Sequence, residues 1–157
     1  MISVLRYVLL LALVLWIGGI VFFSFIASPS IFKILPREQA GEVVGDIFPK
    51  YHLLGYASCV LALGCLFSLK QLGAAQASGA AIILLLLMGG VQVTMGTIVG
   101  PNVIEARDAV KAAPSGPEKE RLEQKFRRLH GVSMILNLSL LILGLVLLYR
   151  LSVRLQL

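Results

Sequence analysis

The sequence has few charged residues and few of the residue types that carry most enzyme chemistry. Charged side chains make up 14% of the 157 residues, and the chain holds two histidines, two cysteines and one tryptophan. Hydrophobic residues make up 58%, which leaves too little polar surface to cover a soluble globule of this size. The composition excludes an ordinary soluble domain and predicts an integral membrane protein.

The sequence also lacks the motifs of the common enzyme and metal-binding classes. It contains no Walker loop, dinucleotide fingerprint or nucleophile and base pair, and no spacing typical of zinc, iron–sulfur or c-type haem sites. Cys59 and Cys65 lie on one expected helix, roughly 240° apart around its axis, so they cannot form a disulfide with each other. We therefore lean towards a protein that is not an enzyme.

Four uncharged segments are each long enough to form a transmembrane helix. They cover about residues 7–28, 51–69, 79–100 and 129–149. Runs of this kind predict helices, because the strands of a membrane β-barrel would alternate between apolar and polar residues. We predict an all-α membrane bundle that forms one domain, residues 1–157, with a polar turn at residues 70–78.

The two longer connections, residues 29–50 and 101–128, differ in character. Pro29 is expected to end the first helix, and an amphipathic surface helix is expected between Ile31 and Phe48, with an apolar face and three acidic residues opposite it. The second connection is more strongly charged. It is expected to form a short helix, break near Pro114 and then continue into the fourth span.

The distribution of lysine and arginine predicts the orientation. Ten of the fourteen basic residues fall in the two longer connections, and the other four are Arg6, Lys70, Arg150 and Arg154. By the positive-inside rule, the connections are expected to be cytoplasmic and both termini extracytoplasmic, in the plasma (inner) membrane. The net charge of +6 is then explained by orientation and anionic lipid. We predict contact with the bilayer and no nucleic-acid partner.

The two halves of the chain share a pattern that predicts two tandem two-helix repeats. Each half contains a Gly-Gly pair, a proline, a long connection and a Phe-x-x-x-His sequence that opens the second helix. The residues are Gly18-Gly19, Pro29 and Phe48 to His52 in the first half, and Gly89-Gly90, Pro101 and Phe126 to His130 in the second. Such a parallel repeat would give the bundle a pseudo-twofold axis along the membrane normal.

The repeat makes His52 and His130 symmetry mates and the centre of an expected ligand site. Other polar or sulfur-containing residues follow them at helical spacing or lie on the third span, and they define an expected polar lining. These residues are Tyr56, Cys59, Gln92, Ser133, Met134 and Asn137. Two histidines with Cys59 and Met134 would suit copper(I) or another soft metal, paired imidazoles would suit haem, and histidine also suits proton relay. The alternative is that both histidines anchor or pack the helices, with no cofactor.

A set of short motifs along nearly the whole chain resembles the four-helix membrane family of unknown function that includes human transmembrane protein 205. The matching residues are Trp16, Gly18-Gly19, Phe22-Phe23, Ser28-Pro29, Phe32, Leu35-Pro36, Ala40-Gly41, Phe48-Pro49, Tyr51, Pro101-Asn102, Phe126, Leu129-His130-Gly131, Ser133 and Asn137-Leu138. The resemblance implies a four-span protein without an assigned activity.

Three functional hypotheses follow. The first is a multi-pass membrane protein that binds or transports a soft metal or small ligand at His52 and His130. The second is a structural or assembly subunit of a larger membrane complex that docks a partner through its charged connection. As partners we expect either further copies of this chain in a homo-oligomer or such a membrane complex. The third is a haem-binding redox protein.

Overall fold

The computed structural model describes residues 1–74 and 78–154, and all the secondary structure in these residues is helical. Residues 75–77 of the expected polar turn, and residues 155–157, lie outside the described part. The elements are α1 (Ile2–Val21), η1 (Phe22–Ala27), α2 (Ser28–Ile34), α3 (Arg37–Gln71), α4 (Gly79–Thr94), η2 (Met95–Val99), α5 (Gly100–Ala112) and α6 (Pro117–Arg154), where η1 and η2 are π-helical.

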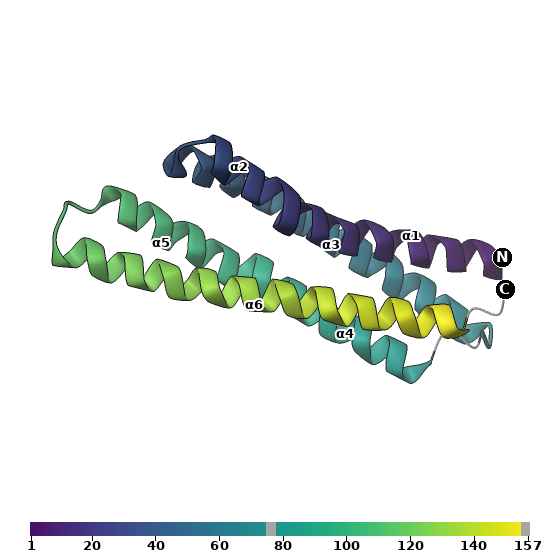
Figure 1. Ribbon diagram of the computed structural model, residues 1–157. Helices are drawn as coiled ribbons and strands as arrows, with labels where there is room; N and C mark the ends of the chain where they lie inside the picture. Colours follow the sequence, from purple (N-terminus) through teal and green to yellow (C-terminus); the bar gives the residue numbers. More distant parts are fainter. Residues whose placement is uncertain (75–77, 155–157) are drawn as a thin grey trace.

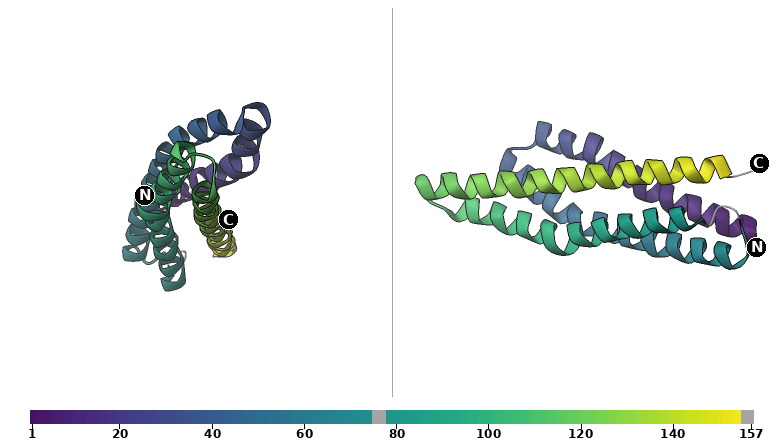
Figure 2. Two further views of the ribbon diagram at one scale, coloured as in Figure 1. Left: turned by 90° about the vertical axis from the view of Figure 1, so that its left-hand side faces the viewer. Right: turned by 90° about the horizontal axis from the view of Figure 1, so that it is seen from below.

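These elements form four long rods packed as an elongated bundle (Figure 1). The rods are Ile2–Ile34, Arg37–Gln71, Gly79–Ala112 and Pro117–Val153, and each is long and apolar enough to cross a membrane. Rods α1 and α3 pack together, as do α3 and α4, α4 and α6, and α1 and α6. The N-terminus and the described end of α6 lie at one end of the bundle (Figure 2). We call the opposite end, where α2 turns into α3 and α5 into α6, the charged end.

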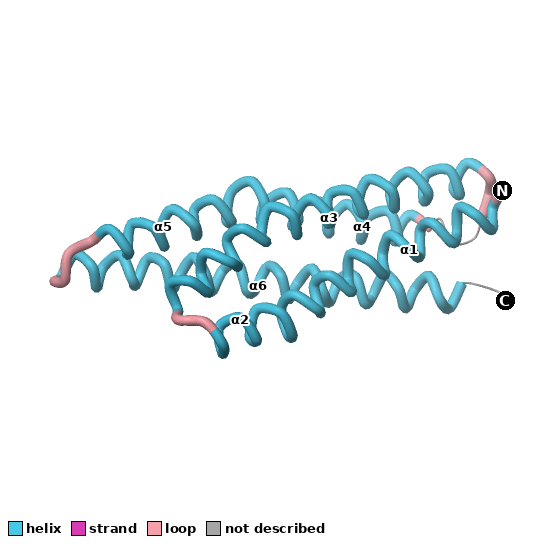
Figure 3. The backbone as a smooth tube through the Cα atoms, turned by 90° about the horizontal axis from the view of Figure 1, so that it is seen from above, coloured by secondary structure: helices cyan, strands magenta, loops and turns pink. Residues whose placement is uncertain are grey.

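The four long apolar helices that the sequence predicts are confirmed, and each rod extends well beyond the expected span. Residues 31–48 do not form a helix of their own, because they are divided between α2 and the first turns of α3. A helix does begin directly after Pro36. The backbone breaks between them only at Leu35 and Pro36, one of the short loops drawn in Figure 3. Helix α3 then runs through Pro49 without interruption. The second connection is helical as expected, with a break at residues 113–116.

Prolines have opposite effects inside the first rod and directly after it. Leu35 precedes Pro36 and is extended, with φ −101° and ψ 149°, as expected for a residue before proline. Ser28 precedes Pro29 but stays helical, with φ −61° and ψ −49°, so the prediction that Pro29 ends the first helix is wrong. A break in an apolar segment would leave backbone carbonyls without water, whereas Leu35 lies at the charged end. The wider π-helical turns of η1 directly before Pro29 accommodate its ring.

Glycine permits close approach of α6 to two other rods at the centre of the core. Gly144 is buried, and a Cβ there would lie 2.8 Å from Ile17 Cγ1 and 3.3 Å from Met88 Cε. Gly131 is also on α6, but a Cβ there would meet no atom within 4 Å. The two glycines therefore provide a matched pair in one helix.

Replacing Gly144 with leucine is expected to destabilise the protein by about 1–3 kcal/mol, because an overpacked core forces neighbouring side chains off their rotamers. Replacing Gly131 with leucine is expected to change stability little. Thermal unfolding of both variants in the same detergent would measure the difference. Equal losses in the two variants would contradict the packing described for Gly144.

Candidate functional site

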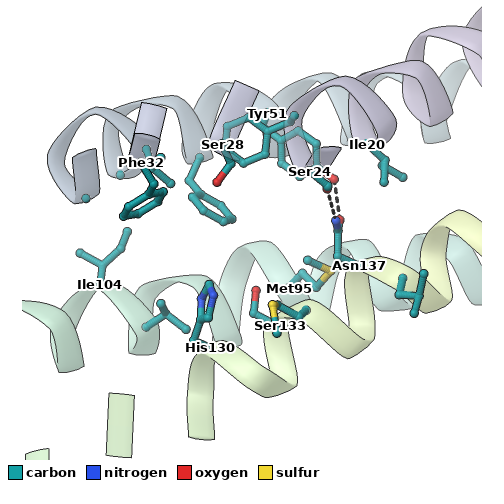
Figure 4. A pocket seen from close by; sticks show the side chains of 18 of the residues that line it. Ile20, Ser24, Ser28, Phe32, Tyr51, Met95, Ile104, His130, Ser133 and Asn137 are labelled. Atoms are coloured by element: carbon teal, nitrogen blue, oxygen red, sulfur yellow. Dashed lines mark hydrogen bonds between the residues drawn. The ribbon is translucent and has the colours of Figure 1, made fainter. Parts of the chain in front are cut away.

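A cavity of about 460 Å³ lies at the charged end, between the first rod, α3, α5 and α6. Side chains from these elements point towards one another across it (Figure 4). Its lining residues are Ile20, Phe23, Ser24, Phe25, Ser28, Phe32, Gly41, Val44, Gly45, Phe48, Tyr51, Met95, Val103, Ile104, Arg107, Phe126, His130, Ser133, Met134, Asn137, Leu138 and Leu141. The volume lies within the range typical of small-molecule sites. We call this space the charged-end cavity.

A three-residue hydrogen-bond chain forms part of the cavity wall. Tyr51 Oη donates to Asn137 Oδ1 at 2.7 Å, and Asn137 Nδ2 donates to Ser24 Oγ at 2.7 Å (Figure 4). The three residues lie on α3, α6 and η1. Asn137 therefore joins three of the four rods at the level where α6 approaches the first two.

Aromatic side chains form the wall behind this hydrogen-bond chain. The rings of Phe23 and Tyr51 are stacked, with centroids 5.2 Å apart, and Phe48 meets Phe23 edge-on at 5.5 Å. Such offset and edge-to-face pairs are favourable beyond the area that they bury. The three rings thus pack into one wall, and this packing positions the Tyr51 hydroxyl.

The rim of the cavity contains exposed apolar side chains from two facing rods. Phe25 is 62% exposed, Phe32 46%, Met134 59% and Leu138 52%. The cavity therefore opens on the outer surface of the bundle, between the first rod and α6. In rods that could span a membrane, that surface is where lipid would be met.

His130 lies exposed on α6 at the outer part of the cavity. Its ring stacks on Phe126 with centroids 5.9 Å apart and an interplanar angle of 20°. Ser133 follows it on the same helix face and also lines the cavity. No hydrogen bond is formed by the side chains of His130, Ser133 or Ser28 within the described part of the chain, so all three retain polar capacity towards the cavity.

Arg107 reaches the edge of the cavity from α5 across the surface of α3. Its Nη1 donates to the carbonyl oxygen of Gly41, and its Nε donates to Asp108 Oδ1 at 2.9 Å. A Cβ on Gly45 would lie 2.6 Å from Nη1, so the guanidinium fits there because that position is glycine. These contacts place a cation beside the cavity.

A second polar cluster lies between α1, α3 and α4. Trp16 Nε1 donates to Gln92 Oε1 at 3.3 Å, and Gln92 Nε2 lies 3.0 Å from His52 Nδ1. The indole N–H can only donate, so it fixes the Gln92 amide with its oxygen towards Trp16 and its nitrogen towards His52. His52 Nδ1 must then accept, and the ring proton resides on Nε2. That atom is buried and has no hydrogen-bond partner in the described residues.

Glycines bring this second cluster into contact with the facing helix. A Cβ on Gly55 would lie 2.6 Å from Gln92 Nε2, and the Tyr56 hydroxyl rests directly against Gly96. The His52 ring lies over the same helix face, near Gly96 and Gly100. The Gly96-x-x-x-Gly100 pattern thus allows polar side chains to pack against the backbone of α4, η2 and α5.

The expected site residues fall into two groups on different helix interfaces. His52, Tyr56, Cys59 and Gln92 face the α3–α4 interface, whereas His130, Ser133, Met134 and Asn137 line the charged-end cavity. Among the described residues, no hydrogen bond or ring pair joins His52 to His130. Residues 1–74 and 78–154 contain no group of three or more His, Cys, Asp or Glu that could hold a metal ion, so the geometry gives no support to a metal site.

Sequence reasoning missed several residues of the cavity. Tyr51, Ser24, Ser28 and Arg107 line it, yet none was expected in the site. Ser24 and Ser28 are four residues apart in an otherwise apolar segment, which places both on one helix face. That spacing was the available signal for a polar surface on the first rod.

Comparison with known proteins identifies a family but assigns no activity. The family described as "Domain of unknown function (DUF4149)" matches residues 11–112. A protein of Aquifex aeolicus (strain VF5), described as "Uncharacterized protein", is 35% identical over 137 residues, which cover 87% of this chain and 86% of that protein. No solved structure matches. The extent of both matches shows that the chain belongs to the DUF4149 family.

Proposed function

We propose that this protein binds a small amphiphilic ligand in the charged-end cavity. The observation that carries the proposal is the cavity itself, which combines apolar walls with a few hydrogen-bonding groups on facing rods. Such a combination is typical of ligand sites, where the apolar surface supplies affinity and the polar groups supply orientation. The exposed apolar rim favours a ligand that enters from the bilayer.

His130 retains the role expected for it, as a residue of the ligand site, but without His52. Its unbonded imidazole and the hydroxyl groups of Ser28 and Ser133 can contact the polar part of a ligand. His52 instead serves the helix interface through Gln92. This division favours the small-ligand hypothesis over the soft-metal and haem hypotheses, which need both histidines at one centre.

The charge distribution supports an inner-membrane location with the cavity towards the cytoplasm. Basic residues are concentrated at the end of the bundle where the cavity lies. By the positive-inside rule, that end would be cytoplasmic and both termini extracytoplasmic. The ligand would then be drawn from the cytoplasmic leaflet.

Two features support the proposed tandem repeat and the kinship with the transmembrane protein 205 family. In each half, a π-helical stretch directly precedes the proline, η1 before Pro29 and η2 before Pro101. Some of the residues that match the transmembrane protein 205 family also line the cavity, among them Tyr51 and Asn137. Both inferences are compatible with the proposed binding function.

A second candidate function is that of an assembly subunit. The segment from Pro117 to Arg128 carries exposed charges of both signs, including Arg121 and Arg128, and this surface would suit a polar partner or a second copy. Co-purification of a stoichiometric partner that is lost when Arg121 and Arg128 are replaced by serine would favour this function. Purification of a stable homo-oligomer at native expression would count against a larger complex.

Filling the cavity tests the proposed function directly. Ser133 lines the cavity, whereas Ser139 lies on the same helix outside it and bonds its own backbone through Ile135. Ser133→Phe is expected to lower the amount of bound amphiphile about tenfold, because the ring occupies space that the ligand needs. Overpacking of this kind costs about 1–3 kcal/mol, and a loss of about 1.4 kcal/mol in binding free energy lowers the affinity tenfold. Ser139→Phe is expected to bind as the wild type does.

The measurement is mass spectrometry of amphiphiles extracted from protein purified in a mild detergent. The wild type should retain a defined amphiphile in a fixed molar ratio. A wild type that carries only the average lipid mixture of its membrane, or equal retention by both phenylalanine variants, would overturn the proposal.

A further inference from the structure

We propose that the ligand of the charged-end cavity carries an acidic head, a carboxylate or phosphate on an acyl chain, and that Arg107 recognises it. This inference rests on the proposed function and adds the chemical class of the ligand. It is drawn from the charge of the lining, the free donors of Arg107 and the direction in which the cavity changes from polar to apolar.

The lining has one sign of charge. Of the residues that line the cavity in the described part of the chain, Arg107 alone is formally charged, and neither aspartate nor glutamate is among them. The nearby carboxylate of Asp108 contacts Arg107 from outside the cavity and is 56% exposed. The Arg107 side chain is 22% exposed, so water screens this pair only in part. Because Asp108 lies outside the cavity, the lining itself still carries one positive charge and no negative one.

The guanidinium has donors left for a ligand. An arginine side chain offers five N–H groups in a planar fork. The contacts with Gly41 O and Asp108 Oδ1 use Nε and one N–H of each terminal nitrogen at most. Two N–H groups therefore remain. Bidentate recognition of carboxylate or phosphate is the chemistry for which arginine is best suited.

The cavity has a polar outer part and an apolar inner part. Arg107 and His130 lie towards the charged end, and Ile20, Met95 and Leu141 lie deepest in the bundle. The wall on α6 runs from Phe126 to Leu141, about 22 Å at 1.5 Å per residue. An acyl chain laid along this wall would place its acidic head beside Arg107, where His130 and Ser28 can add hydrogen bonds.

The test compares acidic and neutral amphiphiles with the same chains. Oleate is paired with oleyl alcohol, and phosphatidic acid with the diacylglycerol of the same acyl composition, each titrated into the full-length purified protein and measured by native mass spectrometry. We expect the wild type to bind an acidic member about tenfold more tightly than its neutral counterpart, as charge-assisted hydrogen bonds allow. Preference within the oleate pair identifies a free fatty acid as the source, and preference within the phosphatidic acid pair identifies a phospholipid.

Three variants show whether Arg107 is responsible. Arg107→Gln should abolish the preference and leave binding of the neutral amphiphiles, which also shows that the variant is folded. Arg127→Gln removes the same charge from an exposed position on α6 that pairs with Glu123 and should keep the preference. Gly45→Ala changes no charge but moves the guanidinium, since its Cβ would lie 2.6 Å from Nη1, and should weaken the preference.

The outcomes separate this inference from the proposed function. A wild type that binds acidic and neutral amphiphiles equally, or an Arg107→Gln protein that keeps the preference, would overturn the role of Arg107 while the binding function stands. Failure of every amphiphile to bind the wild type would overturn both.

Discussion

Replacing Gln92 with leucine is expected to destabilise the protein by about 2–4 kcal/mol. Leucine has a similar volume, so the change removes hydrogen bonds without opening a large cavity. It leaves Trp16 Nε1 and His52 Nδ1 unpaired in the interior. A buried donor or acceptor that loses its partner costs about 1–3 kcal/mol, so two such groups would cost about 2–6 kcal/mol. We expect the lower part of that range, because side-chain hydrogen bonds between membrane helices average about 0.6 kcal/mol.

Thermal unfolding in detergent would measure this loss, with Thr97→Val as the control. Thr97 is exposed in η2 and bonds only the backbone oxygen of Val93 in its own helix, so its loss should be small. A Gln92→Leu protein as stable as Thr97→Val would show that the cluster joining α1, α3 and α4 contributes little.

The same cluster predicts which nitrogen of His52 carries the proton. The donor-only indole of Trp16 orients Gln92 so that His52 Nδ1 accepts, and the Nε2–H tautomer is expected in the wild type. In Gln92→Glu the two side-chain oxygens of an ionised residue 92 only accept hydrogen bonds. His52 should then donate from Nδ1 instead. Nitrogen NMR of the histidine side chains can distinguish the tautomers, and assignment is simple because the chain has two histidines. An Nδ1–H signal from His52 in the wild type would contradict the proposed orientation of Gln92.

The number and nature of the helices could be predicted because hydrophobic length alone determines them. Uncharged runs of about twenty residues need internal hydrogen bonds in a membrane, which only helices supply to a single segment. The ends of the helices could not be predicted in the same way. Pro29 and Pro49 lie inside helical rods, because local proline rules are weaker than the cost of exposing backbone groups or losing packing.

The sequence predicted which residues of one helix line the site, but not which residues of other helices face them. Helical spacing placed His130, Ser133 and Asn137 on one face of α6, and all three do line one cavity. Periodicity gives no information about which helix faces them. The hypothesis that His52 is their partner rested on equal position in the repeat, but His52 is turned towards Gln92, whereas its neighbour Tyr51 meets Asn137. Adjacent residues of a helix point about 100° apart, so a small error in helix rotation changes the expected partner.

Replacing Asn137 with leucine is expected both to destabilise the protein and to alter its ligand binding. The change removes two interhelical hydrogen bonds, from Tyr51 and to Ser24, at a cost of about 1–3 kcal/mol. It also frees the Tyr51 hydroxyl in the middle of the cavity. We expect weaker binding of acidic and neutral amphiphiles alike, because the site would lose the two hydrogen bonds that hold η1, α3 and α6 at a fixed separation.

The effect of Asn137→Leu on ligand binding is expected to differ from that of Arg107→Gln, so one binding assay distinguishes the two variants. Loss of Arg107 should remove a preference between acidic and neutral ligands, whereas loss of Asn137 should lower affinity for both and keep the preference. Leu145→Ala on the same helix provides a control that should bind both ligands as the wild type does, since Leu145 is 51% exposed and does not line the cavity. If Asn137→Leu binds both ligands as the wild type does while losing stability, the hydrogen-bond chain supports the bundle and has no part in shaping the site.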